Sequence, residues 1–216
     1  MIGSVISGIK IPDSKLAREA TEFVRDRETE FLFHHSVRVY LWGALLGERL
    51  GLNIDPELFY TASLFHDLGL TEGFRESQLR FEVDGANAAR DFLRDHGISQ
   101  TDTEQVWLAI ALHTTPGIPE HLHPIGTLTA AGVMMDIVGY GYEGYTDEQR
   151  NAVEVAYPHA PGFTERFLDT LYGGLAHRHD STHATGLADV VADKVPHFHR
   201  RNFCSLMRNA PWADKV

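Results

Sequence analysis

Cysteine, long apolar runs and positive charge are all scarce in this chain, and each shortage excludes a class of protein. The single cysteine, Cys204, rules out a disulfide within the chain and suits a reducing compartment. No apolar run approaches the roughly 18–20 residues of a membrane-spanning helix. The net charge of −11 argues against nucleic acid and anionic membranes as partners, because both require a basic surface. The apolar start, MIGSVISGIK, lacks the basic region of a signal peptide, so we expect a cytoplasmic protein.

Histidine, in contrast, is abundant. The chain has 13 histidines, and histidine is the side chain best suited to proton transfer and a common metal ligand. Metal chemistry is therefore one explanation, and exposed or hydrogen-bonded bystanders are the simpler one for any single histidine.

Helical signals recur along the chain and strand-like alternation is nearly absent, which predicts an all-α fold in the form of a single-domain helical bundle. Residues 1–28 form an expected N-terminal helical extension, and residues 29–216 form the main domain. Asp84 is the expected N-cap of one helix, and Thr101 with Glu104 has capping-box spacing at the start of the next. The expected helices cover about residues 14–27, 29–49, 55–67, 84–97, 101–113, 125–138, 146–156, 163–176 and 186–194.

Several polar side chains fall on the apolar faces of these expected helices. An inward-facing carboxylate without a partner costs several kcal/mol, so something buried must satisfy it. For one inward histidine, a hydrogen bond to the backbone is the simpler interpretation. For three histidines and two carboxylates on four helices, a shared cation explains the pattern better. The five residues are His35, His66, Asp67, His113 and Asp136.

The His66-Asp67 dipeptide near a helix end suits a two-residue metal anchor. Adjacent helical residues diverge by about 100°, so an ion between the two directions can bind both side chains. Two nitrogen and two oxygen donors leave coordination positions open for water, which is typical of a catalytic site. Such mixed ligands suit Zn, Fe(II), Mn or Ni and disfavour Ca or Mg.

The runs HHSVRVY at 34–40 and LFHDLGL at 64–70, with the distant Asp136, resemble the H…HD…D signature of the HD superfamily. Within it the chain most resembles the cyanamide hydratase-like branch, over about residues 29–212. The resemblance implies that the main domain is an HD-type helical bundle. Its segments are HSVRVY, LFHDLGLT, RFEVDGANAARDFL, AIALHTTPGI and PHFHRRNFCSLMRNAPW.

The same resemblance implies one divalent metal ion, with Zn or Fe(II) foremost and Mn or Ni as alternatives. Its implied ligands are His35, His66, Asp67 and Asp136. His113 aligns with a histidine beside the metal-bound water, so we expect it to be catalytic, with Asp67 assisting the proton transfer.

Two further residues are expected at the substrate pocket. Glu82 stands in the RFEVDGA segment, and a surface glutamate is the alternative interpretation. His121 and its neighbour His123 lie in a proline-rich loop after His113, where they fit either a cover for the pocket or a second metal. So tight a pair favours a site with one metal ion.

These residues predict a metal-dependent hydratase or hydrolase that uses metal-activated water. The resemblance implies a small substrate with an unsaturated carbon–nitrogen bond, such as cyanamide or a nitrile-like compound. HD phosphohydrolases commonly have a lysine after their HDIG motif, and Leu70 stands there in this chain, which disfavours phosphate chemistry.

Two alternatives remain open. The first is an HD-type phosphohydrolase, which needs basic groups near the ion, with Arg38 and Arg75 as candidates. The second is a non-catalytic, metal-binding regulatory domain. A small-molecule substrate is the expected partner, and the sequence leaves the oligomeric state open, with a homodimer as one alternative.

Overall fold

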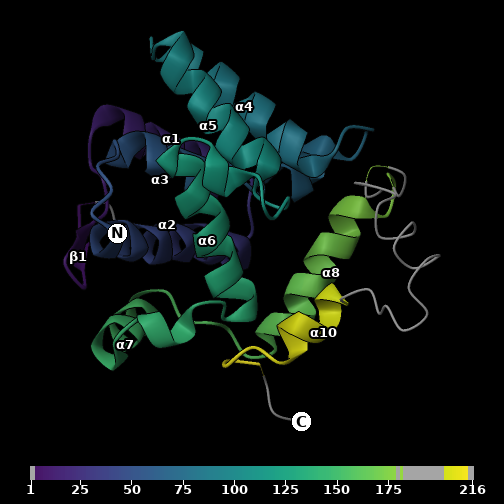
Figure 1. Cartoon of the computed structure of the whole chain (residues 1–216). Helices are drawn as coiled ribbons and strands as arrows, with labels where there is room; N and C mark the ends of the chain where they lie inside the picture. The colour runs from purple at the N-terminus through teal and green to yellow at the C-terminus, as the bar shows by residue number, and fades with distance from the viewer. Residues whose placement is uncertain (1–2, 179–180, 182–201, 214–216) are drawn as a thin grey trace, which may run out of the picture.

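The structure, a computed structural model, describes residues 3–178, 181 and 202–213, and this part of the chain is helical apart from one small hairpin (Figure 1). The hairpin consists of β1 (Val5–Ile6) and β2 (Ile9–Lys10), paired antiparallel. The all-α prediction is confirmed. The α-helices are α1 (Lys15–Arg25), α2 (Glu30–Leu50), α3 (Pro56–Phe65), α4 (Phe81–Asp95), α5 (Gln100–Leu112), α6 (Pro124–Val138), α7 (Asp147–Ala156), α8 (Phe163–Leu175) and α10 (Phe203–Arg208), and the 3₁₀-helices are η1 (Leu68–Leu70), η2 (Glu72–Phe74), η3 (Pro119–His121) and η4 (Tyr142–Gly144).

Helix α2 lies at the centre of the bundle and packs against α6 and α3, while α4 packs against α5. Two glycines let α2 and α6 approach closely. A Cβ atom on Gly132 would lie 2.4 Å from the Val39 carbonyl oxygen, and one on Gly43 would lie 2.7 Å from that of Leu128. This close crossing fixes the relative position of side chains on the two helices, among them His35 and Asp136.

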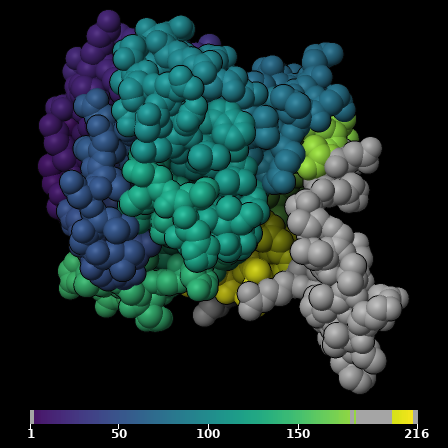
Figure 2. All heavy atoms as spheres, turned by 45° about the horizontal axis from the view of Figure 1, so that its top comes forward, coloured from purple at the N-terminus to yellow at the C-terminus, as the bar shows by residue number. Residues whose placement is uncertain are grey.

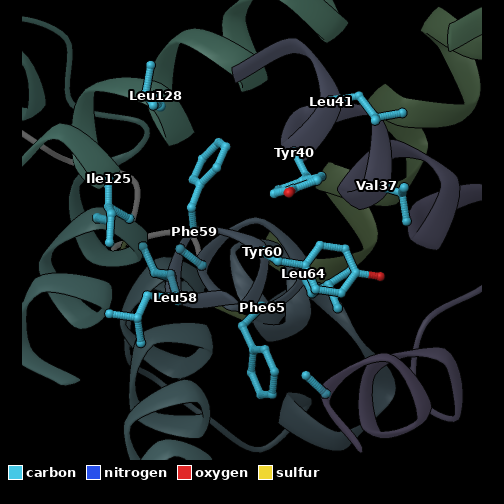
Figure 3. Close-up of a cluster of buried hydrophobic side chains, with 14 of the residues drawn as sticks. Val37, Tyr40, Leu41, Leu58, Phe59, Tyr60, Leu64, Phe65, Ile125 and Leu128 are labelled. Carbon is cyan, nitrogen blue, oxygen red and sulfur yellow. The ribbon is translucent and has the colours of Figure 1, made fainter. Parts of the chain in front are cut away.

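The core between these helices is aromatic and aliphatic (Figure 3). The rings of Tyr40 and Phe59 lie 5.3 Å apart between α2 and α3. Residues 1–28 contribute to the same core, because Ala17, Ala20 and Val24 of α1 are fully buried. The N-terminal segment therefore packs as part of the bundle.

Several helix ends have side chains or glycines that satisfy or terminate the backbone hydrogen bonding. The side chain of Asp55 accepts hydrogen bonds from the backbone N–H groups that open α3. Thr146 and Gln149 form a capping box at α7. Gly51 ends α2 with a left-handed φ of 66°, which a glycine adopts without steric cost.

Two predicted helix starts were wrong. Helix α4 begins at Phe81, because the Asp84 carboxylate does not cap it and instead accepts hydrogen bonds from Ser77 and Arg178. Helix α5 begins at Gln100, because Ser99 caps it before Thr101 is reached.

The hairpin escaped prediction because its strands are only two residues long. Ser7 and Gly8 have φ values of 50° and 87°, as a tight two-residue hairpin turn requires. The predicted helix over 186–194 lies outside the described residues.

The C-terminal helices cover the side of α6 away from α5. Phe163 and Phe167 of α8 and Met207 of α10 share a second apolar cluster with Val133 and Ile137 of α6. In the space-filling view the light green end of α8 lies against the blue segment that precedes α4 (Figure 2). Among the described residues, no helix has the combined length and apolarity needed to cross a bilayer.

Candidate metal centre

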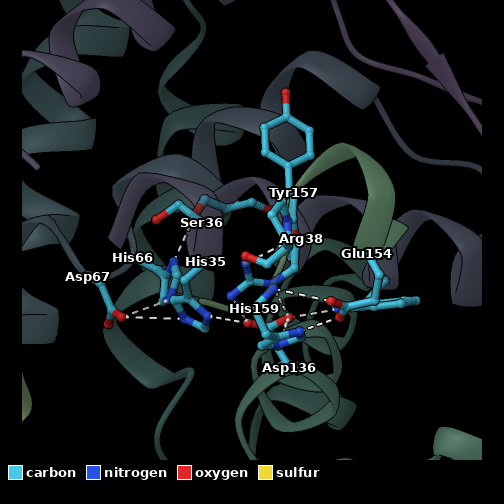
Figure 4. A network of polar contacts seen from close by, with 12 residues as sticks. His35, Ser36, Arg38, His66, Asp67, Asp136, Glu154, Tyr157 and His159 are labelled. Carbon is cyan, nitrogen blue, oxygen red and sulfur yellow. Dashed lines mark hydrogen bonds and ion pairs between the residues drawn. The ribbon is translucent and has the colours of Figure 1, made fainter. Parts of the chain in front are cut away.

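One side chain from α2 and two from the junction between α3 and η1 meet in the interior. His35 comes from α2, His66 follows the last residue of α3, and Asp67 precedes η1. All three are buried, and one ligand atom from each lies within 4.8 Å of the other two. Figure 4 shows the two imidazoles and the Asp67 carboxylate pointing toward one another.

The outer nitrogen of each imidazole has a partner that fixes its proton. His66 Nδ1 lies 2.7 Å from the Ser63 carbonyl oxygen, which only accepts, so Nδ1 donates. His35 Nδ1 lies 2.7 Å from Asp136 Oδ2 and donates to that carboxylate in the same way. In its neutral form each ring therefore has a lone pair on Nε2, and these two atoms face each other at 3.1 Å. A neutral imidazole held by its other nitrogen is the usual form of a histidine metal ligand.

Asp67 adds a carboxylate oxygen to the two imidazole nitrogens of this group. Its Oδ2 atom lies 3.5 Å from His35 Nε2 and 3.3 Å from His66 Nε2. This oxygen is buried and has no hydrogen-bond partner among the described residues. A buried carboxylate oxygen without a donor is costly. Two lone pairs and one carboxylate oxygen in contact require a positive charge between them, and the donor set fits a divalent transition metal ion.

The pKa shifts of Asp67 and His66 indicate that the His35–His66–Asp67 group favours bound positive charge. Burial would raise the pKa of Asp67, but His66 and His35 hold it below its ordinary value. Burial would likewise lower the pKa of His66, but Asp67 holds it above its ordinary value. The carboxylate therefore stays ionised, and it favours a cation on the imidazole side.

His113 approaches this group from the end of α5. Its Nδ1 lies 2.7 Å from the Ile110 carbonyl oxygen and donates to it, so Nε2 again carries a lone pair. That Nε2 lies 3.7 Å from Asp67 Oδ1. Burial and the neighbouring His66 lower the pKa of His113 to about 4. The ring is therefore neutral near pH 7 and can accept a proton.

Glu82 is buried, with 4% of its surface exposed, so the alternative of a surface glutamate is wrong. Its carboxylate accepts hydrogen bonds from Arg80 and from the Thr114 hydroxyl. Burial would raise the pKa of Glu82, but the hydrogen bonds from Arg80 and Thr114 lower it. The ionised carboxylate also favours positive charge on His113, which places Glu82 beside the predicted catalytic histidine.

His121 lies apart from this group. It is exposed at the end of η3, and none of the hydrogen bonds or ion pairs between described residues joins it to His35, His66 or Asp67. A role for His121 at the pocket stays a prediction.

Asp136 occupies the opposite side of His35. Its Oδ2 accepts from His35 Nδ1 at 2.7 Å and from Arg38 Nη2 at 2.9 Å. Its Oδ1 accepts from Arg38 Nε and Trp42 Nε1, both at 2.8 Å. Burial would raise the pKa of Asp136, but Arg38 and His159 hold it well below its ordinary value. The structure does not bring Asp136 into the three-residue group, and its role as a fourth ligand stays a prediction.

Three further residues surround Asp136, and only Arg38 among them was named from the sequence, as a basic group near the ion of a phosphohydrolase. Arg38 and Trp42 lie three and seven positions after His35 on α2, so helical spacing already placed them on the same face. His159 Nε2 lies 3.3 Å from Asp136 Oδ1, and its ring stacks on Trp212 at 4.8 Å. His159 follows α7 in an irregular segment, where no periodic signal could have indicated it.

Residues 32–156, more than half of the chain, match the HD domain family, and together with the buried His-His-Asp group they define a metal-binding helical domain of that kind. The chain belongs to the HD domain family. HD domains are generally metal-dependent hydrolases, and His35, His66 and Asp67 offer such a site here.

One curated relative is the bifunctional uridylyltransferase/uridylyl-removing enzyme of Thiobacillus denitrificans (strain ATCC 25259 / T1). It is 43% identical to this chain over 58 residues, which are 27% of this chain and 6% of the relative. The chain thus matches only a small part of that protein's length.

Proposed function

We propose that this protein is a metal-dependent hydratase or hydrolase of a small, uncharged molecule with an unsaturated carbon–nitrogen bond, such as cyanamide or a nitrile-like compound. The observation that carries the proposal is that the arginines around the metal group already bind protein acceptors. Arg38 is 1% exposed and donates to Asp136 and to the carbonyls of Tyr157 and Pro158. Arg80 donates to Glu82 and Thr114. A phosphate ester would meet little spare positive charge from these residues.

The position after the His-Asp turn supports the same conclusion. Leu70 stands where HD phosphohydrolases commonly have a lysine, and it is 8% exposed. It packs against Gly174 of α8 so closely that a Cβ atom on Gly174 would lie 2.6 Å from Leu70 Cδ2. The environment at this position is apolar, which suits a neutral substrate better than a dianion.

The residues of the chain supply binding and proton transfer. His35, His66 and Asp67 would hold the ion, with Asp136 fixing the His35 ring. A divalent ion held there supplies Lewis acidity and lowers the pKa of a coordinated water molecule. His113 Nε2, which carries a lone pair, takes a proton from the attacking water and returns it to the substrate nitrogen. Glu82 stabilises the imidazolium while it carries that proton.

The test is a substrate panel on protein loaded separately with Zn, Fe(II) and Mn. Cyanamide, small nitriles and isonitriles would be compared with nucleotides and p-nitrophenyl phosphate, with the His66→Ala variant as background. We expect metal-dependent hydration of at least one carbon–nitrogen compound and negligible phosphate release. Robust metal-dependent phosphate release without hydration would reject the proposal.

A phosphohydrolase is the second candidate. It is favoured by the family, and by the uridylyl-removing activity in the name of the relative, because removing a uridylyl group breaks a bond at phosphorus. Metal binding without turnover of any compound in the panel would instead favour a regulatory domain.

A further inference from the structure

Arg178 follows α8, outside the residues that match the HD family, and yet it is one of the most buried charged side chains of the described chain, at 3% exposure. Its guanidinium reaches three other segments. Nη1 donates to the Leu79 carbonyl at 2.9 Å and to the Asp84 carboxylate. Nη2 donates to the Gly69 carbonyl, and Nε donates to the Gly174 carbonyl at 2.8 Å.

Gly69 belongs to the turn that sets the direction of Asp67. The turn closes through the Leu70 N–H, which donates to the Asp67 carbonyl at 2.9 Å. It also lies against the start of α4 with no spare room, since a Cβ atom on Gly69 would lie 2.0 Å from the Phe81 carbonyl oxygen. A group that holds Gly69 to this end of α4 therefore holds the backbone two residues from Asp67.

Helix α8 touches the metal group on a second side. The Phe167 ring meets the His35 ring edge-on, with centroids 4.7 Å apart and an interplanar angle of 69°. Further along α8, Gly174 allows close packing on η1, because its missing Cβ would lie 3.0 Å from Leu70 Cα. The segment after the family match thus contacts both the His35 side and the Asp67 side of the group.

We propose that Arg178 is a positioning residue that orients Asp67 for metal binding by tying η1 to the start of α4. The planar guanidinium has donors in several directions and can serve all four acceptors at once, which a lysine cannot do. The inference rests on the proposed metal site. It does not depend on which substrate is turned over.

The test is the zinc affinity of purified full-length variants, measured by competition with a chromophoric chelator. Arg178→Gln should bind zinc about 10–100-fold more weakly than the wild type, the scale of losing a residue that orients a ligand. Arg178→Lys should lie between the two. The matched control is Arg208→Gln, which removes the same charge from an exposed arginine that pairs with Glu165 and should keep wild-type affinity.

Two further measurements distinguish a positioning role for Arg178 from a purely structural one. Val24→Ala removes buried volume from α1 and should lower the melting temperature without changing zinc affinity. In Arg178→Ala, free guanidinium in the buffer should restore part of the lost affinity. Wild-type zinc affinity in both Arg178→Gln and Arg178→Lys would overturn the inference, whatever their melting temperatures.

The folding and functional outcomes remain distinguishable. If Arg178→Gln does not fold, Arg178→Lys carries the test, because it keeps the charge and alters the same contacts more mildly. If the variants lose zinc affinity but the wild type hydrates no carbon–nitrogen compound, the positioning role stands and the proposed substrate class fails. A wild type that binds no divalent ion would overturn both proposals.

Discussion

Two buried carboxylates lie on either side of His35, and their surroundings differ sharply. Asp136 accepts hydrogen bonds from His35, Arg38 and Trp42, so both its oxygens are satisfied. Asp67 has a buried Oδ2 with no donor among the described residues, and the nearest nitrogens are histidine Nε2 atoms with lone pairs. Residue type and burial are the same at both positions. Their hydrogen-bond partners differ: Asp136 is fully satisfied and holds the His35 ring in place, whereas Asp67 has an oxygen available to bind a cation.

The charges support this division of roles. Arg38 neutralises Asp136 through a two-point contact, so a metal ion on that side would compete with an arginine already in place. The Asp67 side has one carboxylate and two imidazoles, and no arginine among the described residues pairs with that carboxylate, so the Asp67 charge can partly offset that of a divalent ion bound there. Variants of Asp67 and of Asp136 should therefore differ in their effect on metal binding, and comparing them tests the proposed roles of both carboxylates.

The largest effect is expected on the Asp67 side. His66→Ala and Asp67→Asn should each lose most of the bound metal and all turnover above background, because each removes a ligand from the group. Both variants should keep their helical circular dichroism spectrum. Metal content by elemental analysis is the measurement, with His96→Gln, a partly exposed histidine that pairs with Glu19, as the control. Wild-type metal content in either ligand variant would contradict the assignment.

The second prediction concerns the histidine that contacts Asp67 without belonging to the three-residue group. His113→Ala should keep its metal and lose turnover by about 10²–10⁴-fold, the scale of a positioned proton-transfer group. The ratio of metal to protein and the kcat of the same sample should be measured together. Should the variant be purified without metal, His113 would have to be reassigned as a ligand.

The helices and the inward faces of the site residues were predictable because both follow from local patterns. Helices α2 and α3 begin within one residue of the expected starts at residues 29 and 55, and His35 and His66 are fully buried as their helical spacing predicted. The H…HD…D pattern also indicated the family correctly. These are short-range signals, and they survive in one sequence without any three-dimensional information.

The partners of the site residues were less predictable, because they depend on contacts between distant segments. Nothing in the sequence near Asp84 indicated that its carboxylate would bind Arg178 instead of capping α4. The spacing of Asp136 placed it inward but could not say which nitrogen of His35 it would face. Such choices are settled by how closely α2 and α6 cross, which depends on Gly43 and Gly132.

The third prediction concerns the Asp136 side. Asp136→Asn leaves the Arg38 charge buried without its counterion, which typically costs about 3–5 kcal/mol of stability. Because His35 loses its orienting carboxylate, metal affinity should also fall by about 10–100-fold, without the complete loss expected for Asp67→Asn.

Trp42→Phe is the milder companion to Asp136→Asn, since it removes one donor to Asp136 and should cost about 1 kcal/mol. Denaturant unfolding and zinc titration would check both variants. Complete metal loss in Asp136→Asn, equal to that of Asp67→Asn, would establish Asp136 as the fourth ligand.

The smallest effect should come from a carboxylate and a histidine at the surface, which provide the reference for the two buried carboxylates. His96 Nε2 lies 2.6 Å from Glu19 Oε2, joining the end of α4 to α1. Burial would lower the pKa of His96, but the Phe92 carbonyl and Glu19 raise it above 6.5. The hydrogen bond from His96 lowers the pKa of Glu19 below 4.5. Solvent reaches both groups, so water satisfies them when the pair is broken.

The pair should stabilise the fold only within a limited pH window. Since folding raises the pKa of His96, its contribution is complete below pH 6.5 and is lost as the pH rises through the folded value. Since folding lowers the pKa of Glu19, its contribution is complete above pH 4.5 and is lost as the pH falls. The melting temperature of His96→Gln should therefore fall further below that of the wild type at about pH 5.5 than at about pH 8.5. An equal difference at both pH values would mean that His96 acts through packing on Phe92 rather than through its charge.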